Sequence, residues 1–413
     1  MPLRLLVVDQ SLRDFEGHHY DYSAAIVRSA SQMGLNVSIA PHREFPDNAL
    51  ANAPVVGRFS NDWGASRRSR LNTWARAALT RLPRSVRAPL LSFAARGGSG
   101  ASHPVAAETG FGREFLQILS KLRFERCDHV LVHTIGAADF LGLAAVLERH
   151  QPVAPTLHIV LRYDGVAELR AAFRSLTNTG HLLRYWTDTE PLAAQYRELG
   201  CPAIGVLPIP HGLTALPPPR SDLRQPITLS YLGGARSDKG FHLLPDLVDQ
   251  LVSDGVVPGR ARFLIQATFG VSREEGRMEA ARRRLARHSP DCVTLIEAPP
   301  DSDGFQRALQ ATDLLLLPYD REVYRRRSSG LLVQAMALGI PTVVPAGTWL
   351  ALASPKGANV AFESVDTFSE AARLAIATIT SLRRATMVAA CDVQGSQTAD
   401  KLMARLVTPL ASR

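Results

Sequence analysis

The segment 313–344 has the residue types of an anion-binding site, in the order that such a site needs. The apolar run DLLLLPY predicts a buried strand ending near Pro318, and Ser328-Ser329-Gly330 then opens the helix pattern LLVQAMAL. Serine is a favoured N-cap, and glycine lets a ligand approach the backbone closely. The first N–H groups of a helix have no partner inside it and carry partial positive charge. This helix start therefore predicts a diphosphate site, although many ordinary strand–turn–helix units also begin with serine.

A glycine turn with nearby cations follows another predicted strand. The pattern ITLSYL ends at Gly233-Gly234, and Arg236 and Lys239 precede the next helix pattern. Two cations beside a glycine turn can neutralise the two phosphates of a leaving nucleotide diphosphate. The alternative is a solvated loop in which these cations pair with Asp238.

Both segments belong to a regular alternation of strand and helix patterns. Predicted strands cover 3–9, 36–40, 129–134, 156–163 and 184–187 in the first half, and 227–234, 262–268, 292–298, 313–319 and 341–346 in the second. Such an alternation favours parallel sheets built from right-handed crossovers, and open sheets of this kind bind ligands beyond the carboxyl ends of their strands. We therefore predict an α/β fold of two Rossmann-like domains with parallel sheets facing across a cleft.

The length of the chain also favours two domains. Its 413 residues exceed the size at which one hydrophobic core usually keeps growing. The proline-rich, polar stretch 215–226 is the predicted linker between an N-terminal domain over 1–214 and a C-terminal domain over 227–385. Residues 386–413 are predicted to form a C-terminal helix that is a candidate to pack back on the N-terminal domain.

Composition narrows the class of protein. Hydrophobic residues make up 46% and charged residues 21%, which is typical of a globular protein and excludes wholesale disorder. The four cysteines form no CxxC or Cys/His cluster, which suits a reducing compartment. The first apolar run stops at Asp9 without a cleavage site, and no stretch approaches the ~18 apolar residues that span a bilayer. We expect a cytoplasmic protein that is not integral to a membrane.

The net charge of +9 favours anionic partners, and residues 57–100 concentrate it. Nine arginines in this segment are opposed by Asp62 alone, with tryptophan, leucine and phenylalanine between them. Such a segment suits the inner, anionic face of a membrane as a peripheral contact. The alternative is a basic helical insertion that packs on its own domain and solvates its arginines. No nucleic-acid motif accompanies the charge, so nucleic acid is not an expected partner.

The two anion-binding segments resemble the donor-binding domain of retaining GT-B glycosyltransferases of the group 1 kind, family 4 and its relatives. That family carries a G-R-…-K-G turn and a PSxxEGFGxxxxEAMAxGxPVV stretch. The matching pieces here are GGARSDKG and PYDREVYRRRSSGLLVQAMALGIPTVV, and 184–212 resembles the end of the family's first domain. The resemblance covers 180–350 well, the first strand and its glycine loop loosely, and 45–110 hardly at all.

The resemblance implies an activity and its partners. It implies transfer of a sugar, with retention of anomeric configuration, from a nucleotide-diphosphate sugar to a glycan or lipid-linked acceptor, in cell-surface polysaccharide or glycoconjugate synthesis. The nucleotide sugar would be a co-substrate, and no separate cofactor is expected. Two alternatives stay open: a GT-B relative with epimerase-like chemistry, and a non-catalytic scaffold that binds a nucleotide sugar.

The donor residues depart from the family pattern at two positions. Paired glutamates, eight positions apart in the family, are matched here by Arg326 and Gln334. Gln334 can hydrogen-bond a ribose hydroxyl through its amide, whereas Arg326 accepts no hydrogen bond and suits a phosphate or an acidic sugar. The spacing from Arg236 to Lys239 is two residues shorter than in the common turn, so Lys239 matches more securely.

The resemblance also places residues of the first half near the acceptor. It implies an acceptor-facing loop at Gly17, His18 and His19, and it matches His133 to a histidine beside the donor sugar, which completes a catalytic set with Lys239 and Arg236. Asp164 ends a predicted strand in the same way as His133. A histidine or aspartate at such a strand end can orient an acceptor or assist proton transfer; the alternative is hydrogen-bonded structure.

A metal site is not expected. Asp301 and Asp303 have the spacing of a chelating carboxylate pair, but they precede a helix pattern and are interpreted as N-cap residues. A helix N-terminus and basic side chains can replace a metal electrostatically. We therefore expect the reaction to be metal-independent.

Overall fold

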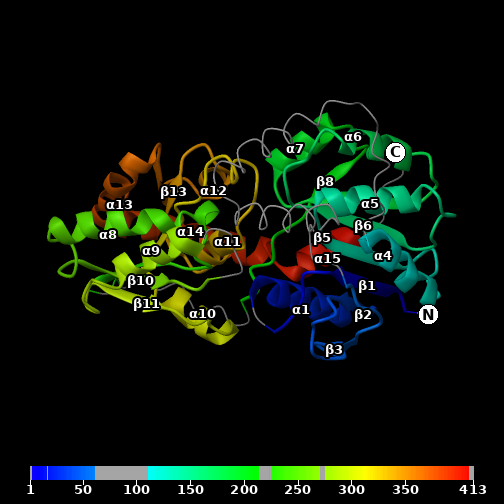
Figure 1. Cartoon of the computed structure of the whole chain (residues 1–413), viewed down its shortest axis with the longest axis horizontal. Helices are drawn as coiled ribbons and strands as arrows, with labels where there is room; N and C mark the ends of the chain where they lie inside the picture. The colour runs from blue at the N-terminus through cyan, green and yellow to red at the C-terminus, as the bar shows by residue number, and fades with distance from the viewer. Residues whose placement is uncertain are drawn as a thin grey trace, which may run out of the picture. The chain divides into compact units, whose positions relative to one another are not determined.

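The computed structural model describes residues 2–15, 17–60, 110–213, 223, 225–269 and 275–408, which contain two six-stranded sheets (Figure 1). The chain divides into two compact units. The first unit comprises Met1–Asp14, Gly34–Trp186 and Tyr196–Ile204, and the second comprises Phe15–Met33, Thr187–Gln195 and Gly205–Arg413. Most of the basic segment 57–100 and most of the predicted linker 215–226 lie outside the described residues.

The first sheet has the strand order β2-β1-β5-β6-β7-β8. Its strands are β1 (Arg4–Asp9), β2 (Asn36–Pro41), β5 (His129–Ile135), β6 (Thr156–Leu161), β7 (Leu183–Thr187) and β8 (Ile204–Val206). The pairings from β2 to β7 are parallel, as the apolar runs predict. The helices interleaved with these strands are α1 (Gly17–Gln32), α4 (Gly110–Lys121), α5 (Ala137–Leu147), α6 (Leu169–Leu176) and α7 (Glu190–Glu198). A two-stranded hairpin, β3 (Ala49–Leu50) with β4 (Ala53–Pro54), follows β2.

The second sheet repeats this arrangement with the order β11-β10-β9-β12-β13-β14. Its strands are β9 (Ile227–Tyr231), β10 (Ala261–Gln266), β11 (Val293–Ile296), β12 (Leu314–Leu316), β13 (Thr342–Pro345) and β14 (Asn359–Phe362), and their pairings are parallel. The helical segments are η1 (Ser237–Lys239), η2 (Phe241–Leu243), α8 (Leu244–Ser253), α9 (Glu275–Leu285), α10 (Ser302–Gln310), α11 (Gly330–Ala337), α12 (Trp349–Ala353), η3 (Val365–Thr367), α13 (Phe368–Ala377), α14 (Ile379–Ser396) and α15 (Ala399–Val407).

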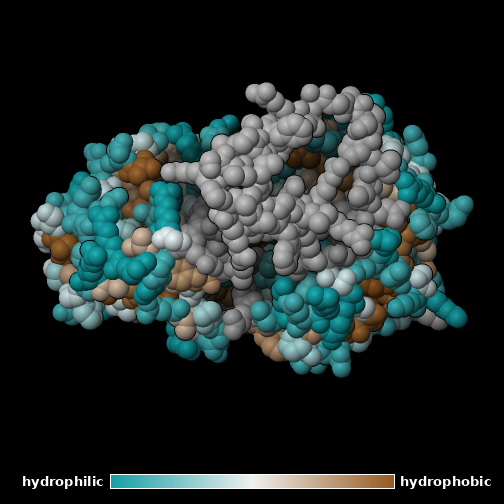
Figure 2. Space-filling model, in the orientation of Figure 1, coloured by the Kyte–Doolittle hydropathy of each residue, from teal (hydrophilic) through white to brown (hydrophobic). Residues whose placement is uncertain are grey.

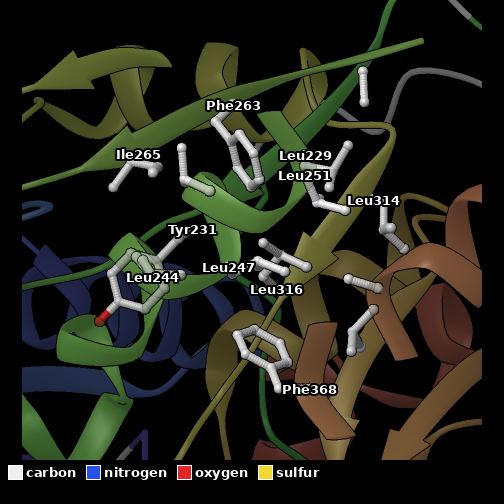
Figure 3. Packing of buried hydrophobic residues seen from close by; sticks show 14 of the residues in the cluster. Leu229, Tyr231, Leu244, Leu247, Leu251, Phe263, Ile265, Leu314, Leu316 and Phe368 are labelled. Carbon is white, nitrogen blue, oxygen red and sulfur yellow. The ribbon is translucent and has the colours of Figure 1, made fainter. Parts of the chain in front are cut away.

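The core of the second unit forms where α8 and α13 cover this sheet (Figure 3). Tyr231 and Phe263 point from the strands toward the leucines of α8, and Phe368 comes from α13. These side chains are almost completely buried. Burial of each large apolar side chain stabilises the fold by about 1.5–3 kcal/mol, so this layer holds β9 and β10 rigidly in place.

In each sheet the first strand in the sequence lies inside the sheet, because later strands are added first on one side of it and then on the other. In the second sheet, β10 and β11 lie on one side of β9, while β12 to β14 lie on the other. In the first sheet, β2 and β5 flank β1 in the same way. The crossovers leave in opposite directions at such a switch point, which opens a crevice beyond the carboxyl ends of the two central strands. The pairs β9/β12 and β1/β5 therefore position any ligand site of their sheets.

No single helix within the described residues is long and apolar enough to cross a membrane, although one bent pair, Val365–Ala377 with Ile379–Ser396, meets the criteria jointly. Among the residues coloured in Figure 2, hydrophilic ones cover most of the visible face, and apolar ones form small separate groups.

Two buried histidines of the first sheet form a hydrogen-bonded chain with Trp186. Trp186 Nε1 donates to Nδ1 of His158 at 3.1 Å, and His158 Nε2 lies 3.0 Å from Nδ1 of His129. Because His158 Nδ1 accepts the hydrogen bond of the Trp186 indole, the ring proton of His158 is assigned to Nε2 and the ring is neutral. Burial, followed by the charge of nearby Arg184, lowers the pKa of His129, and burial and His129 lower that of His158 further.

These depressed pKa values predict a loss of stability in mild acid. Below pH ~6.5 the unfolded chain binds protons that folded His129 and His158 do not, so the free energy of unfolding falls as the pH is lowered, by at most about 1.4 kcal/mol per pH unit for each histidine. We expect His158→Gln to flatten this slope in urea unfolding measured at several pH values. His150→Gln, which replaces an exposed histidine of the same unit, is the control. An equal slope in wild type and His158→Gln would refute the assignment.

Candidate functional site

The candidate site lies at the β9/β12 switch point of the second unit, and a glycine turn forms its floor. Gly233 has φ = 108°, which favours glycine, and its N–H donates to Oε1 of Gln266 at 2.7 Å. Gln266 Nε2 donates to Oγ1 of Thr268 at 2.9 Å, and the Thr268 carbonyl accepts from Ala235 N–H at 2.8 Å. The end of β10 therefore fixes the backbone of the turn that follows β9.

Close backbone packing joins this turn to the segment after β12. Gly240 has φ = 72°, and a Cβ atom at this position would lie 1.8 Å from the carbonyl oxygen of Pro318. Asp320 N–H donates to the carbonyl of Asp238 at 2.9 Å. Only glycine permits this approach, which brings Tyr319 next to Lys239.

Lys239 is a half-buried cation above the glycine turn. Its Nζ lies 3.0 Å from the position that a Cβ on Gly233 would occupy, and 5.8 Å from the centroid of the Tyr319 ring. Burial and the nearby Arg236 charge lower the pKa of Lys239 to about 8, against the opposing effect of Asp238. Lys239 is therefore still mainly protonated at neutral pH. Among the described residues, no carboxylate pairs with this ammonium group.

Arg236 is placed differently from Lys239. Its Nε donates to Oδ1 of Asp238 at 2.8 Å, and its terminal nitrogen also contacts the same carboxylate. The side chain is exposed. This is the pairing that the solvated-loop alternative predicts for one of the two cations, and an anion would have to compete with Asp238 for it.

The N-terminus of α11 has the features of an anion-binding helix end. Ser329 is its N-cap, as predicted, and its Oγ accepts from Leu332 N–H at 3.3 Å. Within the described part of the chain, no hydrogen bond uses the N–H of Gly330 or of Leu331. Gly330 is exposed, and no atom lies within 4 Å of the position of an added Cβ. These two donors are therefore available to an oxyanion.

The segment after β7 fixes the loop that precedes α11. Ser328 Oγ donates to Oδ2 of Asp188 at 2.5 Å, and Thr189 Oγ1 donates to the carbonyl of Arg326 at 2.6 Å. The Ser328 hydroxyl is therefore directed at a carboxylate in this structure. Similarly, Gln334 Nε2 donates to the carbonyl of His211 at 3.0 Å. Ser328 and Gln334, both predicted to bind the donor, therefore lie at α11, and each donates a hydrogen bond to another part of the protein.

Tyr319 links the two parts of the site and was missed in the sequence analysis. Its ring is 3% exposed and lies 4.5 Å from the centroid of Tyr324, and its hydroxyl interacts with the Ser329 side chain. The guanidinium of Arg327 lies over the Tyr324 ring, 5.6 Å from its centroid. The preceding residue, Arg326, is half-buried. The available signal was position alone, since Tyr319 follows Pro318 at the end of a predicted strand.

In the first unit, His133 lies at the β1/β5 switch point and is buried. Its Nε2 lies 2.6 Å from Oδ2 of Asp9, and its Nδ1 lies 2.8 Å from Oγ1 of Thr134. Both ring nitrogens thus have protein partners, the arrangement that the structural alternative predicts. Asp9, which the sequence analysis did not select for chemistry, orients the ring. Asp164 follows β6 and is half-buried.

The remaining candidates are placed by their helices. Gly17, His18 and His19 lie in the first turn of α1 rather than in a loop, so the expectation of a loop was wrong. His19 is half-buried. Asp301 caps α10 by accepting from Gly304 N–H at 2.7 Å, which confirms its interpretation as an N-cap.

The fold of this chain is shared with solved structures of other proteins. No protein-family model matches the chain, and no curated protein matches its sequence. Among solved structures, it is similar to sucrose-phosphate synthase from Thermosynechococcus elongatus, with a TM-score of 0.63 and 13% identity over 98% of each chain. It is also similar to a UDP-forming α,α-trehalose-phosphate synthase from Burkholderia xenovorans in complex with glucose-6-phosphate, with a TM-score of 0.64 and 12% identity over 97% of this chain and 98% of that one.

A third similar structure is the E. coli trehalose-6-phosphate protein bound with UDP-2-fluoro glucose, with a TM-score of 0.65 and 12% identity over 98% of this chain and 99% of that one. Such low identities establish the architecture only. Together with the two parallel six-stranded sheets, these structural similarities confirm the predicted α/β class with two Rossmann-like sheets.

The contact between Gly240 and Pro318 predicts a steric requirement. We expect Gly240→Ala to lower the free energy of unfolding by at least about 2 kcal/mol, because a Cβ meets a backbone carbonyl at a positive φ. Gly276→Ala in α9 is the matched control; nothing lies within 4 Å of its added Cβ, and its effect should stay below about 1 kcal/mol. Urea unfolding measures both, and similar values for the two variants would contradict the packing described.

Proposed function

We propose that this chain, which has the GT-B fold, is a glycosyltransferase that moves a sugar from a nucleotide-diphosphate sugar to an acceptor hydroxyl. The observation that carries the proposal is a pair of unneutralised positive groups at one switch point. One is the Lys239 ammonium above the glycine turn, and the other is the N-terminus of α11 with the open amides of Gly330 and Leu331. Tyr319 contacts both Lys239 and the N-cap Ser329.

This arrangement suits the step in which the donor bond breaks. The bond from the anomeric carbon to the diphosphate oxygen breaks with its electron pair left on the diphosphate. The acceptor oxygen bonds to that carbon and passes its proton to the departing diphosphate. Preorganised donors that face the developing negative charge lower the barrier. Lys239 and the α11 amides would supply this stabilisation, and Arg236 would add to it by leaving Asp238. No divalent ion is required for this charge balance, so we propose a metal-independent reaction.

The similar structures support the choice of donor. One of them is described as UDP-forming and another is bound with UDP-2-fluoro glucose, which makes UDP the first nucleotide to test. We propose that Gln334 contacts the ribose and that Arg326 faces a phosphate or acidic sugar. Retention of configuration, as the resemblance implies, is part of the same proposal.

The acceptor side of the proposal rests on the first half of the chain. We assign acceptor contacts to Gly17, His18, His19 and Asp164, with His133 held by Asp9 as an orienting group. A glycan or lipid-linked acceptor, met at an anionic membrane surface through 57–100, remains our proposal. The glucose-6-phosphate bound by one similar structure makes a sugar phosphate an acceptor class to test beside it.

Nucleotide binding tests the donor site directly. We expect one of UDP, GDP, ADP or TDP to raise the melting temperature with EDTA present, and Lys239→Ala to weaken that binding by about 10- to 100-fold, because a charge-assisted contact contributes roughly 1.5–3 kcal/mol. Lys356→Ala, at an exposed lysine of the same unit, should bind as wild type. Undiminished binding in Lys239→Ala would remove the site assignment.

Sugar transfer is then tested with the nucleotide that binds. Incubation with its sugars and with glucose-6-phosphate or glycan acceptors should release the nucleotide diphosphate only when an acceptor is present, and NMR of the product reports the anomeric configuration. Release or epimerisation without an acceptor would favour the altered-chemistry alternative. Tight binding with no turnover would favour the scaffold alternative.

A further inference from the structure

The ring of Tyr319 occupies a fixed position at the centre of the candidate site. The backbone N–H of Tyr319 donates to the carbonyl of Leu317 at 2.8 Å, and this hydrogen bond turns the chain directly after β12. On one side of Tyr319 the Pro318 carbonyl packs on Gly240, and on the other side Asp320 N–H donates to the carbonyl of Asp238. The ring is almost completely buried between these segments and Tyr324. The ring therefore has little freedom to move.

Three groups meet this ring. The Lys239 ammonium lies 5.8 Å from its centroid, the Tyr324 ring lies 4.5 Å away at an interplanar angle of 49°, and the side chain of Ser329 contacts its hydroxyl. Lys239 belongs to the loop after β9, whereas Ser329 caps α11. Tyr319 is thus a direct connection between the two positive groups of the site.

An aromatic face holds a lysine in a way that a carboxylate cannot. A free lysine side chain has about 2 kcal/mol of rotamer entropy to lose on immobilisation. A π face attracts the ammonium by about 0.5–2 kcal/mol and leaves its net charge intact. An ion pair would instead cancel the charge that an anionic ligand needs. The neighbouring Arg236 illustrates the contrast, since its guanidinium is paired with Asp238.

We propose that Tyr319 is a positioning residue that keeps the Lys239 ammonium desolvated above Gly233 and aligned with the N-terminus of α11, so that the two positive groups act on one diphosphate. This inference rests on the proposed function for the identity of the ligand. The placement of Lys239 by Tyr319 can be measured without any ligand.

The charged and titratable groups around Lys239 set its response to pH. Asp238 in η1 and Arg236 directly before η1 act on it electrostatically, while Tyr319 contributes the ring from the segment after β12. Burial is the largest influence on its pKa of about 8. Without the attraction of the π face, the flexible Lys239 side chain is no longer held in its buried position and its ammonium moves into water. The pKa of Lys239 should then rise toward the ordinary lysine value of about 10.4, even where another side chain fills the space of the ring.

The test compares Tyr319→Phe, which keeps the ring and loses the hydroxyl, with Tyr319→Met, which fills the space without a π face. The first readout is the NMR titration of the lysine Cε resonance, with Lys239→Ala used to assign the signal. Wild type and Tyr319→Phe should titrate near pH 8, whereas Tyr319→Met should titrate at least about one unit higher. Tyr196→Leu, at a buried tyrosine of the first unit, controls for general destabilisation and should leave the titration unchanged.

The second readout is calorimetric binding of inorganic pyrophosphate. We expect Tyr319→Met to bind at least about 10-fold more weakly at neutral pH, with its loss of affinity at alkaline pH moved upward, and Tyr319→Phe to lose less than about 3-fold. Equal Lys239 titration in wild type and Tyr319→Met overturns the positioning role. If Tyr319→Met does not fold, an absence of upfield ring-current shifts on the Lys239 ε-protons of wild type overturns it instead.

These readouts separate the two proposals. A wild type that binds neither pyrophosphate nor any nucleotide diphosphate refutes the proposed function, whatever the Lys239 titration shows. A wild type that binds pyrophosphate through Lys239, with no change in Tyr319→Met, refutes only the role of Tyr319.

Discussion

The candidate site depends on one steric fact, the contact of a glycine with a backbone carbonyl. Because Gly240 has no Cβ, the loop after β9 can lie directly against Pro318 in the segment after β12. That contact places Lys239 beside Tyr319, and Tyr319 beside the N-cap of α11. The hydrogen bond from Asp320 N–H to Asp238 holds the same edge. The electrostatics of the site follow from this packing, because charges act only at the distances that the backbone allows.

The two cations of the loop show how local geometry decides the state of a charge. Arg236 and Lys239 are three residues apart, yet one is exposed and paired with Asp238 while the other is half-buried against an aromatic ring. Burial that would be costly for an isolated charge is tolerable here, since the ring and the partial exposure compensate part of the lost hydration. A ligand with two negative charges could pair with Lys239 directly, whereas pairing with Arg236 would require it to displace Asp238.

The sequence predicted the sheets well because their information is local. A parallel strand buried on both faces is a continuous apolar run, and ten such runs became strands. The short edge strands β8 and β14 carry too little apolar pattern and were not predicted. Caps such as Ser329 and Asp301 were also local signals. The partners of Ser328 and Gln334 are more than a hundred residues away, so no spacing could reveal that their protons are directed to Asp188 and the His211 carbonyl.

The loop from Gly233 to Gly240 is anchored at both of its ends, by Gln266 at one and by Pro318 at the other. Exchange of a side chain between these two anchors leaves both of them in place. A turn two residues longer between Arg236 and Lys239, the common spacing in the family that this segment resembles, would instead require the chain to follow a different path between Gly233 and Gly240.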